Sequence, residues 1–211
     1  MELTVQDNGN ERLLRFVPIP LVFRHAESAA PKFSSKNNKT VAETIQHRRY
    51  ATLAAKTREH YPEFLEHGLG DFLAALRARG DSFYRRFLNP HGDQTYCVFT
   101  IEDRAHLYKR GLYAYLVSQE LRYIGRCRDT FKNRINNGYG RISAKNCYID
   151  GQSTNCHLNA LVTSCQDAVT FEVCELFDVE EICRLEAALI VRYQPRWNIQ
   201  LKRAESANGG S

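Results

Sequence analysis

Residues 111–126 carry two tyrosines that could either pack or react. The segment reads GLYAYLVSQELRYIGR, and Tyr113 and Tyr123 each stand two residues from a glycine, Gly111 and Gly125. Aromatic residues are common in strands, so packing within a β-sheet is one interpretation of the tyrosines. A phenol can also accept a proton, although a reference pKa of about 10 makes it a poor base without a cation nearby. The local sequence leaves both interpretations open.

An arginine and a glutamate further along the chain extend this set. Arg134 lies in a short basic stretch, TFKNRIN. An arginine is always charged and can hold a phosphate through two N–H groups. Glu186 stands in an apolar run, LEAALIV, where a carboxylate without a partner would be costly to bury. Ordinary positions on helix surfaces are the structural alternative for both residues.

The charges of the chain are distributed unevenly around a net charge of +5. Seven Lys and Arg residues lie in 32–58 against one acid, and seven more lie in 122–145 against Asp129 alone. Residues 146–183 contain seven acids and no Lys or Arg. This distribution favours an anion-facing surface made from two separate segments, with solvated helix faces as the alternative.

Seven cysteines is a high count for a chain of 211 residues. Five of them, from Cys147 to Cys183, fall nine residues apart, but the segments between them share no pattern and no C-x-x-C pair occurs. We therefore expect reduced, mostly buried thiols rather than disulfides or a zinc site. No apolar stretch is long enough to span a membrane, and the N-terminus lacks the pattern of a secretory signal, so we expect a cytoplasmic location without membrane contact.

The elements that must position these side chains begin with a hairpin. Residues 112–117 and 121–125 predict two strands joined by a tight polar turn. Asp129 or Thr130 is expected to cap a short helix over the basic stretch, with Gly138 at its end. A long loop rich in Gly, Asn and Ser follows.

Three further elements complete the C-terminal half. A short amphipathic helix is predicted over 157–165 and an alternating strand over 168–177. The last helix starts at Asp178, with Glu181 three residues on as in a capping box, and Pro195 ends it. The resulting order predicts an α+β fold in which a small three-stranded antiparallel sheet is flanked by helices.

The N-terminal half has a different character. An apolar patch over 16–23 is expected to dock, and the polar stretch after it to form a mobile linker. Helices are predicted over 41–56 and over 71–79, the second capped by Asp71, and a strand is predicted over 95–101. We therefore expect a mainly helical N-terminal extension.

Taken in order, the candidate residues resemble the GIY-YIG nuclease family. The match consists of Gly111-Leu112-Tyr113, Tyr123-Ile124-Gly125, Arg134, Glu186, and Asn198 within Pro-Arg-Trp-Asn. Each element alone is common, but the ordered set is specific and covers the C-terminal half of the chain. The pattern is most similar to that of the small stand-alone members, which include Type II restriction endonucleases and a phage endonuclease.

The resemblance implies hydrolysis of DNA phosphodiesters at a site with one divalent cation, Mg²⁺ or Mn²⁺. It assigns Glu186 as the metal ligand and Arg134 as the residue that stabilises the transition state. Tyr113 is the implied general base, with Tyr123 beside it, and a cation such as Arg126 or Arg134 would favour the phenolate. Asn198 is expected to orient the site rather than to react.

Two departures from the family pattern concern the helix that carries Arg134. This arginine follows Tyr123 by one residue more than in most members, so we expect a small bulge or a shifted helix start. Members often have a His or Tyr one helical turn after the arginine, but that position is Gly138 here. Tyr139 and His157 are the two candidates to assist proton transfer in its place.

DNA contacts are expected from residues around the catalytic set. Basic side chains suit phosphate contacts, and the amides of the loop over 139–159 suit contacts to adenine edges, although such loops are usually only polar. The candidates are Arg126, Arg128, Lys132, Arg141, Lys145, Asn146, Gln152, Asn155, Arg48 and Arg49.

The expected organisation follows from these assignments. Residues 1–110 would serve DNA binding, specificity or dimerisation, residues 111–203 would form the catalytic domain with the loop insertion over 139–159, and residues 204–211 would be a disordered tail. The expected function is that of a Mg²⁺-dependent Type II restriction endonuclease of prokaryotic or phage origin. It would act on double-stranded DNA as a homodimer or larger homo-oligomer, since symmetric cutting needs two one-metal sites. A phage or mobile-element nuclease of loose specificity and a catalytically silent DNA-binding protein are the alternatives.

Overall fold

The computed structural model describes residues 1–25 and 31–199. The tail expected over 204–211 lies outside the described residues. By its contacts the chain divides into two compact units. Unit 1 comprises Met1–Arg24, Phe99–Asn137 and the described chain from Ser164 onward, and unit 2 comprises His25–Val98 and Gly138–Thr163. Both units combine separate stretches of sequence, so their division does not follow the boundary expected at residue 110.

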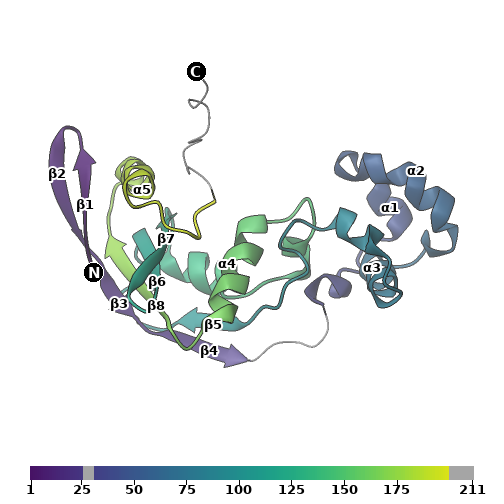
Figure 1. Cartoon of the computed structure of the whole chain (residues 1–211), viewed down its shortest axis with the longest axis horizontal. Coiled ribbons are helices and arrows are strands. Elements are labelled where there is room, and N and C mark those ends of the chain that lie inside the picture. The colour runs from purple at the N-terminus through teal and green to yellow at the C-terminus, as the bar shows by residue number, and fades with distance from the viewer. Residues whose placement is uncertain (26–30, 200–211) are drawn as a thin grey trace, which may run out of the picture. The chain divides into compact units, whose positions relative to one another are not determined.

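Unit 1 contains a four-stranded antiparallel sheet with the order β3-β8-β6-β7 (Figure 1). The α+β class with antiparallel sheets is confirmed, but the prediction of three strands is wrong, because the apolar patch near the N-terminus supplies a fourth. Val17 pairs with Val173 and Ile19 with Phe171. The patch therefore docks by adding a strand to an open sheet edge. The strands are β3 (Val17–Ile19), β8 (Val169–Glu175), β6 (Gly111–Val117) and β7 (Glu120–Cys127).

Two smaller sheets also use the N-terminal segment, where a mainly helical extension was expected. One is the hairpin of β1 (Glu2–Asp7) and β2 (Asn10–Arg15), and the other pairs β4 (Leu21–His25) with β5 (Val98–Ile101). The first hairpin turns at Asn8-Gly9, whose φ values are 51° and 84°. Asn-Gly is a strong turn signal for a hairpin, so the sequence contained the evidence for these strands.

The hairpin between β6 and β7 confirms the predicted tight turn. Its two central residues, Ser118 and Gln119, have φ values of 50° and 67°. Positive φ at both positions is the mark of a type I′ turn, whose twist matches that of the strands. The same hairpin pairs Tyr113 with Gly125 and Tyr115 with Tyr123. The turn places Val117 opposite Glu120, and a one-residue register shift between Tyr115 and Leu116 then brings Tyr113 opposite Gly125.

The central sheet has one aliphatic face and one aromatic face. Leu112, Ala114 and Ile124 are buried in a core with the leucines and isoleucines of helix α5 (Val179–Tyr193). The alternate positions carry Tyr113 and other rings, with Tyr115 and Phe171 centroids 5.0 Å apart. Because side chains alternate along a strand, α5 covers only the aliphatic face (Figure 1).

Helix α5 begins and ends as the sequence predicts. The Asp178 side chain accepts hydrogen bonds from the backbone N–H groups of Glu180 and Glu181. The chain leaves the helix at Gln194, which adopts a left-handed conformation directly before Pro195. A carboxylate at the N-terminus satisfies amides that have no partner within the helix and also complements the helix dipole.

Unit 2 is mainly helical, but the helix predicted over 41–56 is interrupted. His47 is extended, and a short 3₁₀ turn over Arg48–Tyr50 turns the Tyr50 ring into the core, where its hydroxyl donates to Asp150 at 2.6 Å. The helices are α1 (Val41–Ile45), α2 (Ala51–His60), α3 (Leu69–Ala78) and α4 (Ser153–Ser164), with shorter helical turns η1 (Lys32–Ser35), η2 (Arg48–Tyr50), η3 (Pro62–Phe64), η4 (Ser82–Phe87) and η6 (Ala144–Cys147).

The segment over 139–159 is more ordered than the loop expected there. It contains η6 and the first turns of α4, and Tyr148 pairs with Leu88 across an isolated bridge. The Tyr148 hydroxyl donates to the carbonyl oxygen of Phe33 at 2.9 Å, and both rings lie in the core of unit 2. The segment thus forms part of that core.

The cysteines follow the expectation. No disulfide joins any of the seven, all of which lie in the described residues, and five are buried. Within the described parts of the chain, none of the helices has both the length and the apolar character needed to cross a bilayer.

We predict that Gln119→Gly stabilises the protein by about 1 kcal/mol, because glycine adopts positive φ without the steric cost that other residues bear. Gln46→Gly is the matched control, since Gln46 has a φ of −73° and should lose about 0.5–1 kcal/mol. Urea unfolding measures both. Destabilisation by Gln119→Gly would contradict the assigned turn.

Candidate active site

The two glycines beside the tyrosines are required by close packing. A Cβ atom built on Gly125 would lie 2.7 Å from Cε2 of Tyr113 and closer still to Cζ and Oη. Gly111 has a φ of +145°, and a Cβ there would lie 2.8 Å from the backbone nitrogen of Leu176. Gly125 therefore provides the space in which the Tyr113 ring lies. The glycines thus have a structural role whatever the tyrosines do.

Tyr113 and Tyr123 lie together on the aromatic face. Their ring centroids are 6.1 Å apart and their planes differ by 26°, which is a stacked arrangement. Tyr113 is fully buried and Tyr123 is 7% exposed. Both tyrosines pack in the sheet as aromatic residues often do, so packing accounts for their rings and leaves their hydroxyl groups to be explained.

The helix that carries Arg134 brings its guanidinium group to one of these hydroxyls. Nε of Arg134 donates to Oη of Tyr113 at 3.3 Å. The helix, η5 (Lys132–Tyr139), is of the π type, and the Thr130 side chain accepts from the backbone N–H of Asn133. The backbone N–H of Arg134 donates to the carbonyl oxygen of Thr130, four residues back, at 3.0 Å, so the turn that leads into Arg134 is of the α type. Thr130 is thus the capping residue of the two that were expected.

Glu186 on α5 lies against Arg126 of β7. An Arg126 Nη1 group donates to Oε2 of Glu186, whose side chain is only 12% exposed. Burial raises the pKa of Glu186 above its ordinary value, although the charges of Arg126 and Arg134 act in the opposite direction. Arg126 was expected to contact DNA, and its pairing with Glu186 was not predicted. The only signal in the sequence was the cost of burying a carboxylate in an apolar helix.

Asn198 holds the open edge of β7. Its Oδ1 accepts from the backbone N–H of Ile124 at 3.0 Å, and its Nδ2 donates to the carbonyl oxygen of the same residue at 2.8 Å. Next to it, the Trp197 backbone N–H donates to the carbonyl oxygen of Arg122 at 2.8 Å. The amide thus pairs with the strand as a neighbouring strand would. These contacts agree with an orienting role.

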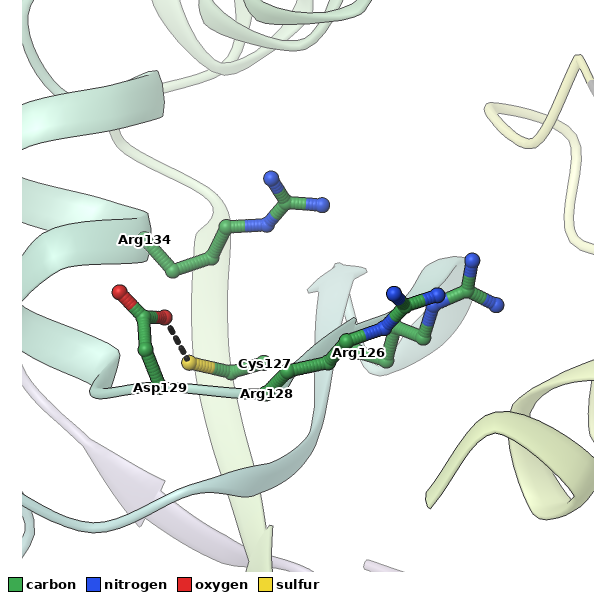
Figure 2. Close-up of a pocket in the computed structure, with 5 residues that line it drawn as sticks. All are labelled: Arg126, Cys127, Arg128, Asp129 and Arg134. Atoms are coloured by element: carbon green, nitrogen blue, oxygen red, sulfur yellow. Dashed lines mark hydrogen bonds between the residues drawn. The ribbon is translucent and has the colours of Figure 1, made fainter. Parts of the chain in front are cut away.

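A pocket of about 260 Å³ lies at the C-terminal end of β7. Figure 2 shows Arg134 reaching over it from its helix, while Arg126 and Arg128 extend from the strand end and Asp129 turns to the thiol of Cys127. Burial raises the pKa of the Cys127 thiol to about 12. The thiol donates a hydrogen bond to Oδ1 of Asp129, and the sulfur and oxygen atoms are 3.4 Å apart. Three guanidinium groups and one carboxylate line the pocket, so it favours an anion.

The residues present fit a cation only in part. No group of three or more His, Cys, Asp or Glu residues in the described chain could hold a metal ion. Mg²⁺ needs fewer protein ligands, because it usually keeps several waters and binds one or two carboxylates together with substrate phosphates. Glu186, whose partner Arg126 lines the anion pocket, is a carboxylate that suits that requirement. One of its oxygens, however, already accepts from Arg126.

The two candidates for assisting proton transfer belong to unit 2. Hydrogen bonds of a π helix join residues five apart, so the residue one turn after Arg134 is Tyr139 rather than Gly138. Tyr139 is buried, and its carbonyl oxygen accepts from Nδ2 of Asn159 at 2.7 Å. His157 lies beside His91, with ring centroids 4.4 Å apart.

The remaining candidates for DNA contact divide by exposure. Arg128 and Lys132 flank the start of η5 in unit 1, and Lys132 lies over the exposed ring of Tyr108. In unit 2 the amides serve the protein itself, since Asn146 caps η6 through Ser143 and Asn155 donates to Gln152 at 2.7 Å. Four of the candidates in that unit are exposed basic residues: Arg48, Arg49, Arg141 and Lys145.

We predict that Gly125→Ala destabilises unit 1 by about 1–3 kcal/mol, because its methyl group overlaps the Tyr113 ring. The same change in a Tyr113→Ala background should cost clearly less, since the ring is gone. Urea unfolding of the four proteins measures the coupling. An equal cost in both backgrounds would argue against this contact.

Comparisons of the chain with protein-family models, with curated proteins and with solved structures found no match.

Proposed function

We propose that this chain is a Mg²⁺-dependent DNA endonuclease of the GIY-YIG type. The observation that carries the proposal is the hydrogen bond to the Tyr113 hydroxyl from Arg134, which also lines the arginine pocket. Glu186 approaches the same pocket through its contact with Arg126. Tyr113 of β6 thus meets Arg134 of η5, and Glu186 of α5 meets Arg126, whose side chain lines the same pocket as Arg134.

Arg134 has two tasks in this proposal. As a donor to Oη of Tyr113, it favours the phenolate form of that side chain, and the phenolate then accepts a proton from the attacking water. As a wall of the pocket, it neutralises the charge that grows on the phosphoryl oxygens during hydrolysis. A guanidinium group suits both tasks because it has several donors in a fixed geometry.

Glu186 is the residue that holds the cation, with the remaining ligands supplied by waters and by the phosphate of the substrate. When bound, Mg²⁺ supplies positive charge to the phosphoryl and leaving oxygens. Tyr123 supports the Tyr113 ring by stacking, and Asn198 fixes the strand that carries both Tyr123 and Arg126.

The substrate we propose is double-stranded DNA cut at a specific site, as by a Type II restriction endonuclease. Arg126, Arg128 and Arg134 favour phosphate in the pocket, and the exposed basic residues of unit 2 offer further phosphate contacts. One such site cuts one strand at a time, so symmetric cutting calls for a homodimer or a larger homo-oligomer.

We predict that the protein cleaves plasmid DNA with Mg²⁺, and that Glu186→Gln and Arg134→Ala each reduce the rate at least about 100-fold, because each removes a charge that the transition state needs. Glu180→Gln, an exposed change on the same helix, is the control and should retain full activity. Gel electrophoresis reports the result. Discrete fragments support site-specific cutting, whereas smears or nicks indicate a nuclease of loose specificity. No cleavage by the folded wild-type protein would refute the proposal.

We predict that Tyr113→Phe lowers the cleavage rate by about 100-fold or more, whereas Tyr123→Phe has a smaller effect. The reason is that Tyr113 is the phenol to which Arg134 donates. Both changes keep the ring and therefore the packing. Single-turnover rates between pH 6 and 10 measure the difference, and equal losses in the two variants would exclude Tyr113 as the specific base.

A further inference from the structure

The carboxylate of Glu186 is already occupied by a cation from the protein itself. Nη1 of Arg126 donates to its Oε2. The side chain of Glu186 is 12% exposed and that of Arg126 is 34% exposed. A buried carboxylate without a partner is costly, so Arg126 provides the counter-charge in the protein as it stands.

Arg126 also lines the arginine pocket, so its side chain lies between two anionic partners. One is Glu186, and the other would be an anion that enters the pocket lined by Arg126, Arg128 and Arg134. Asp129, the one carboxylate of the pocket, already accepts from Cys127 and from Nδ2 of Asn133. The pocket therefore has more positive than negative charge, and an entering phosphate would attract Arg126 towards itself.

We propose that Arg126 is a positioning residue that makes cation binding at Glu186 depend on phosphate binding in the pocket. This inference rests on the proposed function. In the free protein Arg126 pairs with Oε2 of Glu186, and a divalent cation competes with it, because two cations on one carboxylate repel each other. A phosphodiester in the pocket offers Arg126 a second partner and so releases Glu186. Cation and substrate then bind cooperatively, which restricts the complete site to protein with DNA bound.

The test measures Mn²⁺ binding by the electron paramagnetic resonance of the free ion. In the free protein Arg126→Gln should bind Mn²⁺ about tenfold more tightly than wild type. The reason is that Mn²⁺ no longer competes with the charged hydrogen bond from Arg126 to Glu186. Arg128→Gln is the matched control. It removes the same charge from the same pocket, but Arg128 has no ion-pair partner among the described residues. Arg126→Lys keeps the counter-charge and should stay close to wild type.

The second arm adds dimethyl phosphate, a stable phosphodiester, at constant ionic strength. It should tighten Mn²⁺ binding in the wild type more than in Arg126→Gln, since only the wild type has an arginine to release. Glu186→Gln combined with Arg126→Gln should abolish the gain in affinity. The thermal midpoint of unfolding with and without Mn²⁺ is a second readout, which does not require the variant to be as stable as wild type. Mn²⁺ should raise the thermal midpoint of Arg126→Gln more than that of wild type.

The inference is overturned if Arg126→Gln and Arg128→Gln gain equal affinity for Mn²⁺, or if Arg126→Gln gains none. It is also overturned if the gain in Mn²⁺ affinity persists without Glu186. Equal effects of dimethyl phosphate on the wild type and on Arg126→Gln would overturn it as well. None of these measurements uses cleavage. A protein that cuts DNA but shows no effect of Arg126 refutes only this inference, whereas a protein that never cuts DNA refutes the proposed function.

Discussion

The register between β6 and β7 is the constraint on which the rest of the site depends. Tyr113 lies opposite Gly125, where the absence of a side chain leaves room for the ring. A slip of one residue would send every side chain of β7 to the other face of the sheet. The Arg126 side chain would then no longer face α5, and Glu186 on that helix would lose its counter-charge. Three features hold that register: the type I′ turn at one end of the hairpin, the one-residue register shift between Tyr115 and Leu116, and Gly125 near the other end.

From this register the site acquires contributions from both faces of the sheet. Tyr113 lies on the aromatic face, where η5 delivers Arg134, and Arg126 lies on the face covered by α5, where it meets Glu186. The pocket at the end of β7 is the place that side chains from both faces can reach. A strand end suits such a convergence, because the sheet no longer separates its two faces there.

Much of this arrangement could be predicted from local sequence. The hairpin, the Asp178 cap of α5 and the strand β8 each depend on short-range patterns, namely turn residues, capping groups and period-two alternation. The failures share a cause. β3 is three residues long and contains a proline, so its sequence does not predict a strand. It forms a strand because it pairs with the edge of β8. The helix predicted over 41–56 breaks because the core of unit 2 takes up the Tyr50 ring, and helical periodicity carries no information about that core.

The sequence by itself determined which chemical groups are available and where the local elements begin and end. It identified the tyrosines, Arg134, Glu186 and Asn198 as candidate site residues, because residue types and their order can be read directly from the sequence. Only the tertiary structure decided which of them meet. Arg126 and Glu186 are 60 residues apart in sequence, and Arg134 and Tyr113 are 21 apart. Pairing at such distances depends on strand register and helix packing, which long-range burial decides and no local pattern encodes.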